Sequence, residues 1–229
     1  MFDHEITDVF FDLDHTLWDF EKNSALTFAK ILVDNKVKVD LDGFLEVYAP
    51  INMQMWTLYR ENGISKSELR YQRLKQTFDT LRIPISDEVI DVLAHDYIAH
   101  LSSFTHLLPN TVQTLEYLFP KYKLHIITNG FQEVQEKKLK GSSIHHYFQK
   151  IVDSEMAGVK KPDPYIFELA LDMAKVKPKN SLMVGDNLEA DILGAKAMGM
   201  QVLHYNFHRE SNHGECTMIN DLIEIKSIL

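Results

Sequence analysis

Asp12 closes an apolar run at residues 6–12, and a second aspartate, Asp14, follows two positions later. A run that is apolar on both faces predicts a strand buried in a parallel sheet, and α/β proteins bind ligands at the carboxyl ends of such strands. Two positions is the side-chain period of a strand, so both carboxylates can reach the same space. They repel each other there unless a cation or a proton separates them, and Mg²⁺ prefers oxygen ligands. The pair predicts a metal site, with a solvated turn as the alternative.

A second polar cluster, Thr128-Asn129-Gly130, follows another apolar run. A hydroxyl, an amide and backbone N–H groups ahead of a helix suit phosphate oxygens. The alternative is that Thr128 or Asn129 simply caps the following helix. The cluster is therefore a candidate phosphate-binding site.

A third cluster places two lysines, Lys160 and Lys161, ahead of Pro162 and a helical pattern. A lysine next to a proline-fixed helix start can direct its ammonium at an anion with little backbone freedom. The alternative is an ordinary surface turn.

A fourth cluster contains Asp186 and Asp191, and it follows an apolar run at 182–185. Asp191 falls at the start of a predicted helix that is rich in glycine and alanine. Two more carboxylates at the same sheet edge would complete a Mg²⁺ site. An acidic loop with a helix cap is the alternative.

Alternating strand and helix patterns determine where these clusters lie. Further short apolar runs predict strands at 124–128, 151–153, 182–185 and 201–205, and helical patterns occur at 111–119, 131–139, 164–174 and 191–198. This alternation predicts an α/β fold with a parallel sheet and helices on both faces. All four clusters then stand at strand ends on one edge of the sheet, so together they favour one ligand site over four unrelated turns.

Residues 17–106 differ from the rest because they lack strand-like runs and carry helical patterns. One apolar stripe at helical spacing contains Tyr48, Met55, Trp56 and Tyr59, which predicts a packed helix. We therefore expect a helical domain inserted between the first strand and the rest of the sheet. The catalytic core would comprise 1–16 and 107–229.

Composition sets outer bounds on function. The chain has 229 residues, 45% of them hydrophobic, and a net charge of −9, which disfavours binding to nucleic-acid polymers and to anionic membranes. The single cysteine, Cys216, excludes an intrachain disulfide and makes a cytoplasmic location the expectation. We find no signal-peptide pattern and no apolar run long enough to span a membrane.

The four clusters, read as FDLDHT, IITNG, KKPDPYIF and VGDNLEAD, resemble the four motifs of the haloacid dehalogenase-like hydrolase superfamily. The resemblance covers the whole chain, since the helical insert falls where that family carries a C1-type cap. It implies a Rossmann-like parallel sheet with strand order 5-4-1-2-3.

The resemblance also implies a role for each motif residue. Asp12 matches the nucleophile that forms an aspartyl-phosphate, and Asp14 matches the general acid/base. The Mg²⁺ cofactor would be held by Asp12, Asp14 through its backbone carbonyl, and Asp186, with Asp191 close behind. Lys161, rather than Lys160, matches the lysine that offsets charge, and Thr128 and Asn129 match the phosphate-binding position.

Two positions next to the first motif bear on the reaction and the substrate. Dehalogenases of the family lack the second aspartate, so Asp14 favours phosphate chemistry. His15 stands where the family commonly has glycine, and its role is left open. Trp18 follows at the expected hinge, where an aromatic ring either contacts the leaving group or packs.

The segment after Asp12 most resembles the pyrimidine 5′-nucleotidase subgroup of the YjjG type. The expected substrate is therefore a small phosphomonoester, and the expected assembly is a monomer or homodimer. The alternatives are a sugar-phosphate phosphatase or phosphomutase of the same superfamily and, more remotely, a catalytically silent binding protein. A zinc site formed by His204, His208, His213 and Cys216 is disfavoured, because their spacing fits no compact motif.

Overall fold

The computed structural model describes residues 4–229 and divides the chain into two compact units. The sheet unit comprises the residues up to Phe20 together with Thr105–Leu229, and the helical unit comprises Glu21–Phe104. The insert predicted at 17–106 is thus four residues longer at its start and two residues longer at its end than the helical unit. Trp18 consequently belongs to the sheet unit.

The sheet unit is built on six parallel strands in the order β3-β2-β1-β4-β5-β6. Read from the other edge, the first five strands follow the predicted order 5-4-1-2-3, and the two-residue β6 is an addition at the β5 edge. β1 lies at the centre, and all four of its side chains are buried, as its apolar sequence predicts. The strands are β1 (Asp8–Phe11), β2 (Lys123–Thr128), β3 (Phe148–Asp153), β4 (Ser181–Gly185), β5 (Gln201–Tyr205) and β6 (Met218–Ile219).

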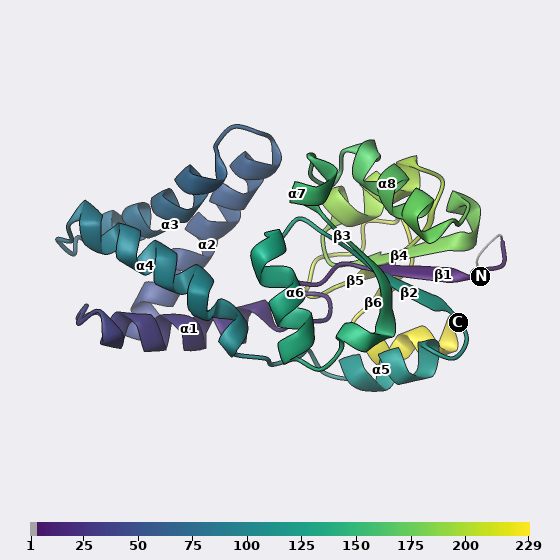
Figure 1. Ribbon diagram of the computed structural model, residues 1–229, viewed down its shortest axis with the longest axis horizontal. Coiled ribbons are helices and arrows are strands. Elements are labelled where there is room, and N and C mark those ends of the chain that lie inside the picture. Colours follow the sequence, from purple (N-terminus) through teal and green to yellow (C-terminus); the bar gives the residue numbers. More distant parts are fainter. Residues whose placement is uncertain (1–3) are drawn as a thin grey trace. The chain divides into compact units, whose positions relative to one another are not determined.

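Helices cover both faces of this sheet, with α8 on one side and α5 on the other (Figure 1). The C-terminal helical turn Leu222–Ser227 packs beside α5, where Asn110 donates to both carboxylate oxygens of Asp221. The helices are α5 (Thr111–Leu118), α6 (Gln132–Gly141), α7 (Ser154–Ala157), α8 (Pro164–Ala174) and α9 (Gly194–Ala197). None of the helices in the described residues is long and apolar enough to cross a membrane.

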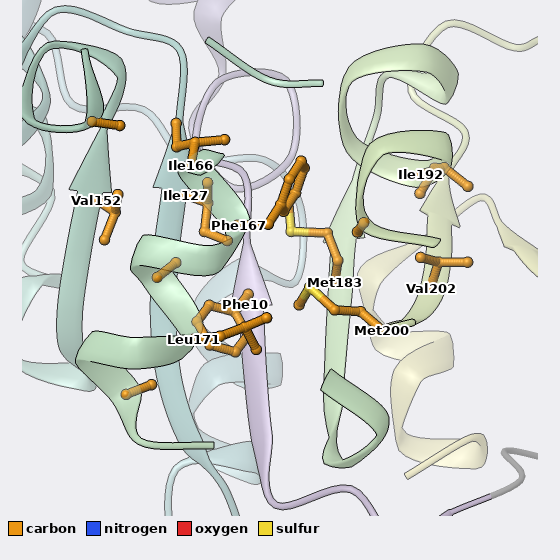
Figure 2. Packing of buried hydrophobic residues seen from close by; sticks show 14 residues of the cluster. Phe10, Ile127, Val152, Ile166, Phe167, Leu171, Met183, Ile192, Met200 and Val202 are labelled. Atoms are coloured by element: carbon orange, nitrogen blue, oxygen red, sulfur yellow. The ribbon is translucent and has the colours of Figure 1, made fainter. Parts of the chain in front are cut away.

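One core cluster fills the space between the sheet and α8 (Figure 2). Each of the first five strands contributes one buried side chain to it, and α8 contributes Ile166, Phe167 and Leu171. The strand residues are Phe10, Ile127, Val152, Met183 and Val202. This packing fixes the strands against one helix, and therefore fixes the loops that leave their carboxyl ends.

The helix predicted at 191–198 was wrong at its start. The chain instead forms a π-helical turn at Leu188–Leu193 and then the short α9. The side chain of Asn187 caps this turn by accepting from the backbone N–H of Ala190 at 2.8 Å. π-helical turns often occur at functional sites, and this one carries Asp191.

The helical unit consists of α1 (Phe20–Asp34), α2 (Leu41–Arg60), α3 (Lys66–Thr80) and α4 (Asp87–His100). Its core is aromatic, with Phe28 packed against Phe44, Tyr48 and Tyr97 at ring distances of 4.6–4.9 Å. The predicted stripe of α2 is confirmed for Tyr48, Met55 and Tyr59, which are buried, whereas Trp56 is only partly buried. The buried side chains are therefore core residues of this unit.

Candidate active site

Asp12 lies at the carboxyl end of β1, where its carboxylate is held by a buried lysine. Lys161 Nζ donates to Oδ1 of Asp12 at 2.6 Å and to Oδ1 of Asp191 at 2.6 Å. It also donates to the backbone oxygen of Ile127 at 2.8 Å. Residues from the first, third and fourth sequence motifs thus meet at one ammonium group.

Three buried carboxylates share this space. One oxygen each of Asp12, Asp186 and Asp191 lies within 4.8 Å of the others. Burial, together with repulsion from Asp191 and Asp186, raises the pKa of Asp12 to about 8 despite the attraction of Lys161. Lys161 brings one positive charge to two of these carboxylates, so net negative charge remains. A divalent cation that prefers oxygen ligands would offset that charge, and the residues therefore fit Mg²⁺.

Asp186 follows β4 and has partners from two other loops. Its Oδ1 accepts from the hydroxyl of Thr16 at 3.1 Å, and its Oδ2 lies 3.1 Å from Nε2 of His208. Burial alone would raise the pKa of Asp186, but the bond from His208, the charges of His15 and His208, and Thr16 together lower it. Asp186 is therefore held as a carboxylate.

Asp14 is held by two side chains of α6 that the sequence analysis missed. Lys138 Nζ donates to both carboxylate oxygens, at 2.6 and 2.9 Å, and Gln135 Nε2 donates to Oδ2 at 3.0 Å. Burial lowers the pKa of Lys138, although Asp14 and Asp12 oppose that shift. Val134 and Leu139 are buried on the same face of α6. Two polar residues inside an apolar stripe were the signal that could have identified them.

The second motif joins this network at two points. Thr128 Oγ1 accepts from Gln135 Nε2 at 2.7 Å and from the backbone N–H of Gly130 at 3.1 Å. The Asn129 side chain pairs with the backbone of Lys161, accepting from its N–H at 2.7 Å and donating to its carbonyl at 3.0 Å. The Asn129 side chain therefore positions the backbone of Lys161.

Gly185 is required by the close approach of Asp191. A Cβ atom at Gly185 would lie 2.3 Å from Oδ2 of Asp191, which is shorter than any real contact. Glycine thus lets the π-helical turn pack its aspartate directly over the end of β4.

The structure gives Trp18 a packing role. Its side chain is fully buried, its Nε1 donates to Ser142 Oγ at 3.2 Å, and Lys138 Nζ lies 4.4 Å from the ring centre. The predicted contact between Trp18 and a leaving group stays a prediction. The lysine that contacts the carboxylates of Asp12 and Asp191 is Lys161, as predicted.

The structure therefore brings Asp12, Asp14, Thr128, Asn129, Lys161, Asp186 and Asp191 to one edge of the sheet, linked through the contacts above. A carboxylate held by a lysine among further carboxylates is suited to nucleophilic and metal-assisted chemistry on an anionic substrate. A second carboxylate two residues on, held by a cation, is suited to proton transfer.

Comparison with known proteins agrees with this geometry. Residues 9–205 match the model of the haloacid dehalogenase-like hydrolases. The chain is 30% identical to pyrimidine 5′-nucleotidase YjjG of Escherichia coli, covering 96% of each chain. It is 34% identical to a glyceraldehyde 3-phosphate phosphatase of Methanothermobacter thermautotrophicus, covering 96% of this chain and 98% of that one.

Among solved structures, the HAD-hydrolase YfnB of Bacillus subtilis, which was determined bound to magnesium, shares this fold. The TM-score is 0.89 at 24% identity, with 99% of each chain covered. The motif residues at one sheet edge, the family match over most of the chain and the relatives of nearly equal length lead to one assignment. The chain belongs to the haloacid dehalogenase-like hydrolase family.

Proposed function

We propose that the chain is a Mg²⁺-dependent phosphomonoester hydrolase that works through an aspartyl-phosphate on Asp12. The observation that carries the proposal is the pairing of the Asp12 carboxylate with Lys161 at 2.6 Å, two residues from a second carboxylate held by Lys138. Dehalogenase activity is disfavoured. Carbon–halogen cleavage needs no acid to protonate the leaving group, so Asp14 would have no role in it.

In this proposal an oxygen of Asp12 attacks phosphorus in line with the ester oxygen, and the P–O bond to the leaving group breaks. Asp14 donates its proton to the departing oxygen, so the alcohol leaves neutral. Asp14 then takes a proton from water as the water attacks phosphorus. The Asp12–phosphorus bond breaks, which releases phosphate and restores both carboxyl groups.

The anionic phosphate would be held by groups from three loops. Lys161 supplies an ammonium that offsets charge on both the nucleophile and the phosphate, and the Thr128 hydroxyl and the Asn129 backbone N–H supply hydrogen bonds. Asn129 also fixes the Lys161 backbone through two bonds, so these residues act as one preorganised unit.

The cofactor would be held by the Asp12 carboxylate, the backbone carbonyl of Asp14 and Asp186, with Asp191 behind them. Bound there, Mg²⁺ would neutralise the charge that otherwise keeps an anionic nucleophile away from an anionic phosphate. Lys161 alone leaves the three-carboxylate cluster with net negative charge, which supports this requirement.

For the substrate we propose pyrimidine nucleoside monophosphates, on the strength of the similarity to YjjG. A sugar-phosphate class is the second candidate, because the relative that is 34% identical acts on glyceraldehyde 3-phosphate. The proposed partners are small phosphomonoesters in either case.

Phosphate release from a panel of monoesters, with Mg²⁺ or EDTA, tests the proposal. The panel contains UMP, dUMP, dTMP, AMP, glyceraldehyde 3-phosphate, a hexose phosphate and an aryl phosphate. We expect Mg²⁺-dependent release that is most efficient on pyrimidine nucleotides and at least about 10³-fold slower in Asp12→Asn.

The outcomes separate the parts of the proposal. A preference for glyceraldehyde 3-phosphate would replace the substrate and keep the mechanism. Near-natural activity in pure Asp12→Asn would contradict the mechanism. No release from any ester would move the assignment to a mutase or a silent binding protein.

A further inference from the structure

Two histidines, His15 and His208, lie beside Asp186. His15 follows β1, Asp186 follows β4 and His208 follows β5, so all three belong to the sheet unit. Nε2 of His208 lies 3.1 Å from Oδ2 of Asp186, and one donor atom of each residue lies within 4.8 Å of the other two. The proposed hydrolysis uses neither histidine.

The ring of His15 is held in place by its neighbours. Its backbone has φ of 61°, a left-handed conformation at the position where the family motif commonly has glycine. The ring centre lies 5.0 Å from Phe20, 4.9 Å from Phe207 and 5.4 Å from His208. These aromatic contacts leave the imidazole beside Asp186 rather than free in solvent.

The loop that carries Asp186 is braced by further histidines. His204 Nε2 lies 2.8 Å from the backbone oxygen of Asp186, so it carries the proton of that hydrogen bond. His204 Nδ1 then accepts from Nε2 of His213 at 2.8 Å, and His213 Nδ1 accepts from the Glu215 N–H at 3.0 Å. Such outer bonds fix the orientation of a ligand group, as they do around known metal sites.

The ligand atoms that His15, Asp186 and His208 offer favour a zinc-class ion over Mg²⁺. Two imidazole nitrogens and one carboxylate oxygen are the usual protein ligands of Zn²⁺ with one open position, whereas Mg²⁺ takes oxygen ligands. Two ligands on a tetrahedral zinc ion, each at about 2.0–2.1 Å, stand about 3.3 Å apart. The 3.1 Å between His208 and Asp186 is close to that spacing, and His208 is partly exposed, so an ion can enter.

We infer that His15, Asp186 and His208 form a second metal site, selective for a transition-metal ion of the zinc class. The site shares Asp186 with the cluster of Asp12, Asp186 and Asp191. An ion bound there would occupy the carboxylate that the proposed Mg²⁺ site needs. Zn²⁺ should therefore inhibit the hydrolase, a consequence that rests on the proposed function, whereas the binding itself does not.

Metal binding is measured directly on the untagged, metal-free full chain. Co²⁺ uptake is followed by its visible absorption, and Zn²⁺ affinity by competition with a chromogenic chelator. The variants are His15→Gly, which suits the left-handed backbone, and His208→Ala. The control is His146→Gln, an exposed histidine that precedes β3 at the opposite end of the strands. Circular dichroism establishes that each variant is folded.

We expect one equivalent of Zn²⁺ to bind the natural chain and the His146→Gln control with the same affinity. His15→Gly and His208→Ala should each weaken it at least about tenfold. Absence of stoichiometric Zn²⁺ or Co²⁺ binding, or unchanged affinity in both folded variants, would overturn the inference. Unchanged affinity would place the ion on the three carboxylates instead.

A second readout separates this inference from the proposed function. With Mg²⁺ saturating, added Zn²⁺ should inhibit phosphate release by the natural chain, and His15→Gly should need at least about tenfold more Zn²⁺ for the same inhibition. Equal inhibition of both would count against the site. A chain that binds Zn²⁺ through the two histidines but hydrolyses no ester would support the site and contradict the proposed function.

Discussion

At the scale of single residues, the central feature is one ammonium shared by two carboxylates. Lys161 lies 2.6 Å from both Asp12 and Asp191, and Asp186 adds a third carboxylate nearby. Burial, together with repulsion from Asp191 and Asp186, outweighs the attraction of Lys161 and raises the pKa of Asp12 to about 8 in the metal-free protein. A proton, the Lys161 ammonium and a metal ion would therefore compete for the same carboxylate oxygens.

A stability measurement tests this charge balance. The folded-state pKa of Asp12 is raised from 3.8 to about 8, so the folded state binds the extra proton between these values. Stability is then lost as pH rises through this window. Between pH 6 and 8 the metal-free natural chain should lose about 2 kcal/mol of unfolding free energy relative to Asp12→Asn. Denaturant unfolding at several pH values measures this difference.

Saturating Mg²⁺ is the control for that experiment. Because the ion would bind the carboxylate form, it should reduce the loss at pH 8 in the natural chain. Parallel pH profiles for the natural chain and Asp12→Asn in EDTA would contradict the charge balance.

Lys138 gives a second prediction at this scale. Replacing it with methionine keeps most of the buried volume but leaves Asp14 with Gln135 and without its bidentate partner. We expect kcat to fall about tenfold or more with little change in KM, because proton transfer depends on a positioned acid. The loss should be larger for nucleotides than for an aryl phosphate, whose leaving group needs less protonation.

Lys137→Met is the matched control, since Lys137 is the exposed neighbour on α6. Lys138→Arg should restore part of the activity. An equal loss for both leaving groups in Lys138→Met would argue for a structural role only.

At the scale of elements, buried strands were predictable and irregular turns were not. β1 and β4 are apolar on both faces, a pattern that solvent-exposed segments do not sustain. The π-helical turn at Leu188–Leu193 has no period of its own in so short a segment, so only its last three residues were predicted as helical, and as part of a regular helix at 191–198. β6 was missed because two residues carry no alternation.

Gly185 links the end of β4 to that turn and gives a third prediction. In Gly185→Ala the new Cβ would overlap the Asp191 carboxylate, so the aspartate must leave Lys161 or the turn must shift. We expect a loss of about 1–3 kcal/mol in unfolding free energy together with a large loss of activity. Chemical denaturation and phosphate release measure the two effects.

Gly214→Ala is the comparison variant. No atom lies within 4 Å of a Cβ at Gly214, and its positive φ should cost only about 1 kcal/mol without loss of activity. If Gly185→Ala behaved like Gly214→Ala, the close approach of Asp191 would not matter.

The motif residues of the candidate site could be predicted from the sequence, whereas the residues that α6 contributes were missed. Asp12, Asp14 and Asp186 follow strand ends directly, and Lys161 and Asp191 lie in the segments that follow β3 and β4, so the strand pattern and the topology together place them at one edge of the sheet. Lys138 and Gln135 were missed because polar residues in the middle of a helix are usually exposed, although these two share a face of α6 with Val134 and Leu139. Only the fold shows that α6 turns them toward Asp14 and Thr128.

At the scale of the whole molecule, the chain consists of a sheet unit with the motif residues and a helical unit inserted after the first strand. The absence of strand patterns was enough to predict the helical unit, and its buried aromatic residues explain why it folds compactly. The chemistry depends on the sheet unit alone in this account. Relatives near 30% identity act on nucleotides and on a triose phosphate, so the substrate panel is the experiment that distinguishes the two candidate classes.

The central claim is that Asp12 becomes phosphorylated during turnover. The most direct measurement is acid quench of the Mg²⁺-loaded chain within milliseconds of mixing with substrate, followed by mass spectrometry of its peptides. We predict a phosphoryl group on Asp12 that accumulates further in Asp14→Asn, because the attacking water then lacks its base. An active enzyme whose quenched peptides carry phosphate on another residue, or none in either protein, would contradict the account.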